Sequence, residues 1–155
     1  MRKLDELYSV PTDLVLGKTI RKQVPAVDQK RQRNEVVAIL QRLRKQPGVV
    51  LADEVGMGKT YVALGVAYSV AVQNPAGPVI VMVPANLVDK WVQDLKTFCE
   101  LYTKDRRPLD RDDPAVLRKD LLAPTTVRYG VARHSVELLK LLDDQPRERC
   151  QLVFL

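Results

Sequence analysis

A lysine and a threonine that directly follow two glycines are the residues whose types and spacing most clearly suggest chemistry. They close the stretch Leu-Ala-Asp-Glu-Val-Gly-Met-Gly-Lys-Thr at residues 51–60. Glycines let the backbone curl so that consecutive N–H groups point at one anion, and the N-terminus of a following helix adds its positive dipole end. The stretch therefore predicts a cradle for a phosphate group.

Each residue type in this cradle suggests a separate role. Gly56 and Gly58 would provide the curl, and the N–H groups from about Gly56 to Thr60 would hold a β-phosphate. Lys59 would reach the β and γ oxygens, and the Thr60 hydroxyl would ligate Mg²⁺. The general P-loop pattern G-x-x-x-x-G-K-[ST] is met except at its first position, where Asp53 replaces glycine. Lys59 and Thr60 are therefore the candidates for catalysis, and Thr60 is the candidate metal ligand.

These residues require a strand before the loop and a helix after it. The β-branched run at 49–51 predicts a short strand, and the segment 59–75 is apolar on nearly all sides, which is typical of a buried helix. Upstream, apolar residues recur at helical spacing at 36, 39, 40 and 43. This spacing predicts an amphipathic helix that ends at Pro47-Gly48.

The rest of the chain alternates between strand and helix patterns. We predict strands over 78–84, 125–129 and 150–155, with helices over 85–102 and 135–144; Asn86 is the expected N-cap, and Trp91 shares an apolar helical face with Leu87, Leu95 and Phe98. This alternation predicts an α/β fold with a parallel sheet and helices on both faces. Residues 1–28 would form a loosely structured lead-in with a short strand near 14–17. The charged, proline-rich segment 103–125 would be a surface excursion that includes the acidic cluster 110–113 and a short helix over 115–122.

Composition narrows the class of protein. The 155 residues suit one domain, and a net charge of +6 permits a polyanionic partner. Cys99, Cys150 and His134 are too few and too scattered for a metal site, and such cysteine usage fits the reducing cytoplasm. Asp5 and Glu6 interrupt any signal sequence, and no apolar run reaches the roughly 20 residues of a membrane span. We therefore expect a cytoplasmic protein that does not enter a membrane.

Two segments resemble motifs of one known family. The stretch at 51–60 closely resembles the first ATPase motif of the Swi/Snf family of helicase-like motors, in which an acidic pair precedes the glycines. The segment 79–95 looks like the next motif of that family, a buried strand that ends in proline and leads into a helix bearing tryptophan. The resemblance implies a P-loop NTPase lobe of the RecA-like fold, part of an ATPase and translocase that depends on double-stranded DNA. The expected cofactors are ATP and Mg²⁺.

The resemblance also implies further binding residues. Family members carry a glutamine that reads the adenine edge, and Gln29 and Gln32 are both candidates. The start of the helix after Pro84 would lie at the carboxyl edge of the sheet, where its N–H groups and Lys90 could hold a nucleic-acid phosphate, although an ordinary surface N-cap remains an alternative. The full candidate set is Asp53, Glu54, Val55, Gly56, Met57, Gly58, Lys59, Thr60, Gln29 and Gln32 for the nucleotide, and Asn86, Leu87 and Lys90 for nucleic acid.

Hydrolysis in this family needs an Asp-Glu-x-His motif and arginines from a second RecA-like lobe, and neither is present in these 155 residues. We therefore expect residues 29–155 to form part of the first lobe of a longer protein and not to turn over ATP alone. Two alternatives stay open. The chain could belong to a P-loop switch or signalling ATPase that does not use DNA, or it could be a non-catalytic fragment that acts only as an interaction surface.

Overall fold

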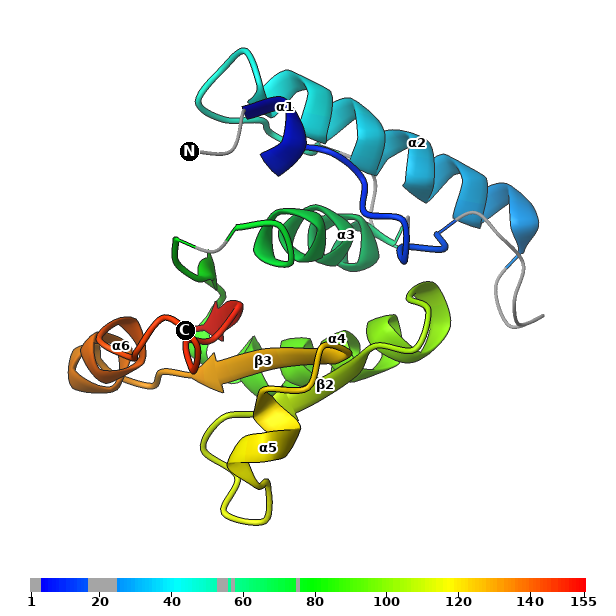
Figure 1. Ribbon diagram of the computed structural model, residues 1–155. Coiled ribbons are helices and arrows are strands. Elements are labelled where there is room, and N and C mark those ends of the chain that lie inside the picture. The colour runs from blue at the N-terminus through cyan, green and yellow to red at the C-terminus, as the bar shows by residue number, and fades with distance from the viewer. Residues whose placement is uncertain (1–3, 17–24, 53–55, 57, 75) are drawn as a thin grey trace.

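A parallel sheet of four strands forms the centre of the protein, in a computed structural model that describes residues 4–16, 25–52, 56, 58–74 and 76–155 (Figure 1). The strands are β1 (Val79–Val81), β2 (Arg107–Asp110), β3 (Thr126–Val131) and β4 (Leu152–Phe154), in the spatial order β1-β4-β3-β2. In the register, Leu152 lies between Val79 and Tyr129. All three strand pairings are parallel, as the alternation of strands and helices predicts.

The direction of each crossover explains which face each helix covers. Helix α4 (Val88–Tyr102) carries the chain across the whole sheet from β1 to β2, whereas α5 (Arg118–Leu121) and α6 (Ser135–Leu142) step back toward β4. Right-handed crossovers that run in opposite directions place their helices on opposite faces. The side chains agree with this rule, because Tyr129 packs into the core shared with α4 while Gly130 faces Leu141 of α6. The prediction of helices on both faces is confirmed.

Two further helices stack above the α4 face of the sheet. Helix α3 (Lys59–Ala71) lies next to the sheet, and α2 (Ala26–Leu43) lies over α3 (Figure 1). The two helices approach closely at Gly65, where an added Cβ would stand 2.8 Å from the Val36 side chain. Val62, Leu64 and Tyr68 are fully buried between these layers, which explains why the segment is apolar on nearly every side.

The strand expected at 49–51 is absent, and an unexpected strand is present further along the chain. Residues 48–52 are described but are not in a strand, and Val50 is 88% exposed, because β-branched residues support a strand only where a neighbouring strand pairs with them. The segment 103–125, expected to be a surface excursion, instead supplies β2, with Leu109 buried in the sheet. Its charge and Pro108 are compatible with a strand because β2 lies at the edge of the sheet.

The described residues 4–16 of the lead-in are also more ordered than their composition suggests. After the short helix α1 (Leu4–Leu7), Leu14 and Leu16 are buried in the main core, and Leu14 forms an isolated antiparallel bridge with Thr103 instead of a strand. The N–H of Val15 donates to the Tyr102 carbonyl at 2.8 Å. The described residues 8–16 are thus part of the folded lobe. The part of the chain that the structure describes holds no helix long and apolar enough to cross a membrane.

Candidate nucleotide-binding site

Two glycines with left-handed backbone conformations precede α3. Gly56 has a φ of 87° and Gly58 a φ of 74°, both in the left-handed region that favours glycine. Gly58 is the N-cap residue of α3, and its carbonyl accepts the N–H groups of Tyr61 and Val62 at 3.0 and 3.3 Å. Gly56 and Gly58 are therefore in neither an extended nor a right-handed helical conformation. The predicted loop residues Asp53, Glu54, Val55 and Met57 lie outside the described residues.

The N-terminus of α3 opens onto a hollow of about 380 Å³. Gly56, Gly58, Lys59 and Thr60 line one side of it. Lys59 and Thr60 occupy the first two positions of the helix, so the positive end of the helix dipole faces the same space. An ammonium group, a hydroxyl and helix N–H groups in one concavity form an arrangement suited to an anion.

A charge pair on α4 also lines this hollow. Lys90 Nζ lies 2.5 Å from Asp94 Oδ2, one helical turn away, and both residues line the hollow together with Tyr61. Burial is the main cause of a raised pKa at Tyr61; Asp94 raises this pKa further, and Lys90 lowers it. Asp94 was missed by the sequence reasoning. Its spacing from Lys90 marks a helical ion pair, but only the packing of α4 beside α3 shows where the pair lies.

Both candidate glutamines are buried on α2, each 4% exposed. Gln32 lies against the loop, because a Cβ added to Gly58 would overlap Gln32 Nε2. Its Oε1 is buried and has no hydrogen-bond partner among the described residues. Gln29 stands three residues earlier, which places it on the same side of the helix. The structure thus brings Gln32 into contact with the loop and keeps Gln29 nearby on the same element.

The start of α4 differs from expectation. Ala85–Leu87 form a turn of 3₁₀ helix directly after Pro84, and α4 begins at Val88 without a side-chain cap. The N–H of Leu87 donates to the Pro84 carbonyl at 2.7 Å, which closes this turn. The expectation that Asn86 caps the helix is therefore wrong, and the N–H of Leu87 is not unpaired. Asn86 and Leu87 are exposed beyond the carboxyl end of β1, while Lys90 faces the glycine loop.

The acidic cluster 110–113 begins at Asp110, the last residue of β2. Asp112 and Asp113 are exposed, as expected, whereas Asp110 lines a separate hollow with Tyr129 and Arg133. Burial, followed by Asp110 and Asp113, raises the pKa of Tyr129 to about 12. Within the described residues, no group of three or more histidines, cysteines and carboxylates could hold a metal ion.

Comparisons with known proteins agree with the two motifs. Three similar proteins are a Xenopus tropicalis SWI/SNF-related regulator of chromatin containing DEAD/H box 1, with 37% identity over 33% of this chain; a Danio rerio chromodomain-helicase-DNA-binding protein 1-like, with 30% identity over 51%; and the RNA polymerase-associated protein RapA of Pseudomonas aeruginosa, with 40% identity over 34%. The aligned parts cover only 5%, 8% and 6% of these relatives.

No solved structure matches the chain. The family comparison, in contrast, covers the glycine loop, α3, β1 and α4 in one continuous match. Residues 31–108, just over half of the chain, match the SNF2-related domain. The chain therefore belongs to the SNF2-related domain family, that of the Swi/Snf helicase-like ATPases.

Proposed function

We propose that this chain is the ATP-binding part of a Swi/Snf-like ATPase and translocase that depends on double-stranded DNA. The observation that carries the proposal is the left-handed Gly58 at the start of α3, with Lys59 and Thr60 beside it in one hollow. This combination supplies N–H groups, a helix dipole and a cation at one point. The names of the relatives, which include chromatin regulators and a helicase-DNA-binding protein, support the choice of motor.

The described loop residues suit ATP and Mg²⁺. In the proposal, backbone N–H groups between Gly56 and Thr60 hold the phosphates, and Lys59 contacts the β and γ oxygens. The Thr60 hydroxyl ligates Mg²⁺, which would neutralise charge on the phosphates. Asp53, Glu54, Val55 and Met57 complete the loop on the basis of the sequence motif.

Gln32 is the better supported of the two adenine-reading candidates. Its buried Oε1 lacks a partner among the described residues, and its amide already touches the loop. Buried polar atoms in folded proteins are nearly always paired, so an unpaired acceptor beside a binding loop suggests a ligand donor. The adenine N6 amino group would be such a donor. Gln29 stays a candidate from its place on the same helix.

The DNA contact is proposed at the start of α4. Asn86 and Leu87 are exposed at the carboxyl edge of the sheet, and the chain carries a net charge of +6. The N–H of Leu87 is used within its turn, so a phosphate contact there would use other groups, such as the Asn86 side chain. Lys90 would serve the duplex only if it turned away from Asp94. A second RecA-like lobe in the parent protein would complete the motor.

Location in the cytoplasm is part of the proposal. Cys99 and Cys150 are buried free thiols, as expected in a reducing compartment.

The test is nucleotide binding to this chain. Fluorescent ATP is titrated into the wild type with and without Mg²⁺, and into Lys59→Ala and the control Lys119→Ala, which removes an exposed lysine of α5. We expect Mg²⁺-dependent binding that Lys59→Ala weakens by about tenfold or more, because a hydrogen bond to a charged group is lost. The control should bind as the wild type does. Equal binding by Lys59→Ala and the wild type would contradict the proposal.

A second measurement separates the motor from the two alternatives. Duplex DNA should stimulate ATP turnover by the full-length parent. Turnover that duplex DNA leaves unchanged would indicate a P-loop switch or signalling ATPase. If the chain does not bind ATP at all, the result would favour the alternative that it is a non-catalytic fragment acting only as an interaction surface.

A further inference from the structure

A second pocket, of about 300 Å³, lies at the opposite end of α3 from the glycine loop. It is bounded by the turn after α3, near Asn74, and by the segment 146–151 that leads into β4. Helix α3 has 13 residues, and a rise of 1.5 Å per residue separates its two ends by roughly 20 Å. The pocket is therefore distinct from the hollow beside Lys59 and Thr60.

Three arginines line this pocket. Arg128 comes from β3, and Arg147 and Arg149 come from the segment before β4. The described lining contains no aspartate or glutamate. Guanidinium groups keep their charge at every physiological pH, so the lining is positively charged.

Neutral backbone groups hold two of these arginines in place. Arg128 donates from Nε to the Arg149 carbonyl at 2.9 Å and from Nη1 to the Leu121 carbonyl at 3.0 Å. Arg149 donates from Nη1 to the Ala76 carbonyl at 2.6 Å and from Nη2 to the Asp144 carbonyl at 3.3 Å. Carbonyl oxygens fix the guanidinium groups without cancelling their charges.

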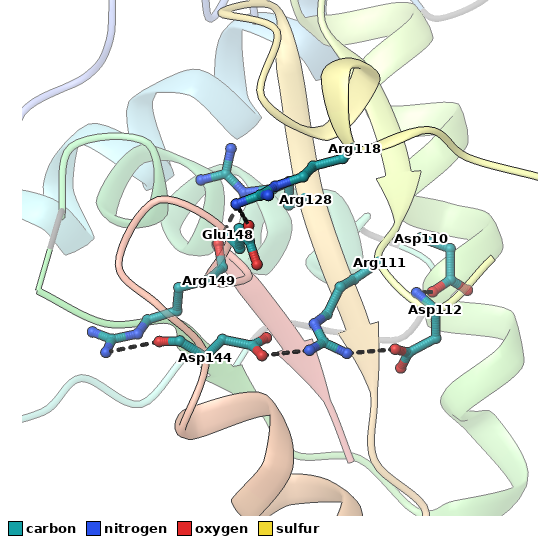
Figure 2. A network of polar contacts seen from close by, with 8 residues as sticks. All are labelled: Asp110, Arg111, Asp112, Arg118, Arg128, Asp144, Glu148 and Arg149. Carbon is teal, nitrogen blue, oxygen red and sulfur yellow. Dashed lines mark hydrogen bonds and ion pairs between the residues drawn. The ribbon is translucent and has the colours of Figure 1, made fainter. Parts of the chain in front are cut away.

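Two carboxylates in the segment before β4 form ion pairs with arginines outside the pocket lining. Figure 2 shows the Asp144 carboxylate facing Arg111, and Glu148 facing Arg118. The C-terminal end of α3 contributes a partial charge of about −0.5, which is small against three full positive charges. If the three arginines served only to cap the C-terminal end of α3, most of their positive charge would stay unbalanced.

Arg147 and Arg149 also carry N–H donors that have no hydrogen-bond partner among the described residues. The Nε of Arg149 is buried and has no hydrogen-bond partner among the described residues. Arg147 is exposed and makes no hydrogen bond or ion pair with the described part of the chain. A buried, unpaired donor beside a second, unpaired arginine is the arrangement that an oxyanion would complete.

We propose that Arg128, Arg147 and Arg149 form a binding site for a phosphate group at the amino end of the sheet. The planar guanidinium group of Arg147 matches two oxygens of a phosphate. Arg128 and Arg149 supply fixed positive charge around it. A free phosphate compound and the backbone of a nucleic acid share this chemistry. The site does not depend on nucleotide binding at the glycine loop.

The test uses inorganic pyrophosphate and calorimetry at low salt. All variants carry Lys59→Ala, so that the glycine loop contributes little. Arg147→Gln should weaken binding by about tenfold, because it removes a charge-assisted hydrogen bond. Arg42→Gln, which removes one exposed charge from α2, is the matched control and should leave the affinity unchanged. Unchanged binding in Arg147→Gln, or an equal loss in both variants, would overturn the proposal.

A second measurement monitors the buried Nε–H group of Arg149 itself. The Nε–H signal of Arg149 in ¹⁵N-resolved spectra should shift when pyrophosphate is added, and an unshifted signal would count against the site. A short DNA duplex identifies the natural source of the phosphate. If Arg147→Gln also weakens duplex binding, the ligand is a nucleic-acid backbone; if it weakens only pyrophosphate binding, the ligand is a free phosphate compound.

Discussion

The side-chain amide of Gln32 lies directly against Gly58, so that α2 and the glycine loop touch at one point. The missing side chain at Gly58 serves two purposes there. It permits a φ of 74°, and it leaves room for the buried glutamine. The space around Gly58 thus depends on a helix that is distant in sequence.

Gly58→Ala should lower the free energy of unfolding by about 2 kcal/mol, since a left-handed alanine is strained and its Cβ would displace the Gln32 amide. Urea denaturation measures the loss. An alanine at Gly56 would meet no atom of the described residues within 4 Å and should show the strain alone. Gly48→Ala, which also meets no described atom and has an ordinary φ, should be nearly neutral. If Gly58→Ala and Gly48→Ala were equally stable, the contact would not exist as described.

Asp13→Ala should destabilise the protein by about 2 kcal/mol, because one carboxylate joins two elements and its loss leaves a partly buried charge unpaired. Asp13 accepts a hydrogen bond from the Tyr68 hydroxyl at 2.5 Å and forms an ion pair with Arg106. Tyr68→Phe removes only one hydrogen bond and should cost about 1 kcal/mol. Arg133→Gln breaks an exposed pair with Asp89 and should change stability by less than about 0.5 kcal/mol. Similar losses in all three variants would refute this ranking.

Gly130→Ala should loosen α6 from the sheet at a cost of about 2 kcal/mol, since the new methyl overpacks a tight contact. Its Cβ would stand 2.8 Å from Leu141 Cδ2 and 3.2 Å from Cys150 Sγ. Chemical denaturation gives the cost, and hydrogen exchange in 135–142 shows whether the helix opens. Adding Leu141→Val should recover part of the stability. A double variant no more stable than Gly130→Ala would argue against this contact as the cause.

Cys99 and Cys150 should resist thiol reagents in the folded protein. Burial raises the pKa of each thiol to about 12. Labelling with a disulfide reagent at pH 8 should be slow in buffer and fast in urea. Equal rates in the two conditions would contradict the burial of both thiols.

The same thiols predict how stability depends on pH. Their pKa in the unfolded chain is about 8.5, so above that pH the unfolded state loses protons first. The contribution of the thiols is therefore complete below about pH 8.5 and is lost as the pH rises toward 12. The raised pKa of Tyr129 acts in the same direction. The urea concentration at the unfolding midpoint should decrease as the pH is raised from 9 to 11. A midpoint that increased over this range would contradict the predicted direction.

The alternation of elements predicted the parallel sheet because buried strands and amphipathic helices carry distinct periods. The same reasoning placed Trp91 correctly against the core. It missed β2 because an edge strand tolerates Arg107, Pro108 and Asp110, which read as surface residues. It placed a strand at 49–51, where the described residues are not in a strand. β-branched residues indicate a preference for strand conformation, but they do not show whether a neighbouring strand is there to pair with them.

In the candidate site, too, the sequence predicted the residues of a local motif but not the residues brought in by helix packing. Gly58, Lys59 and Thr60 are adjacent in sequence, so a local motif was enough to place them at one helix N-terminus. The contact of Gln32 with this loop and the position of Asp94 depend on how α2 and α4 pack against α3. No local pattern encodes that packing.

The bridge between Leu14 and Thr103 has a consequence for synthesis on the ribosome. Asp13 and Arg106, beside it, are 93 residues apart. At roughly 5–20 residues per second, a nascent chain would wait about 5–20 s before the partner segment was made. Until then Leu14 and Leu16 would stay in contact with water or with a chaperone, so this early segment is expected to join the fold late.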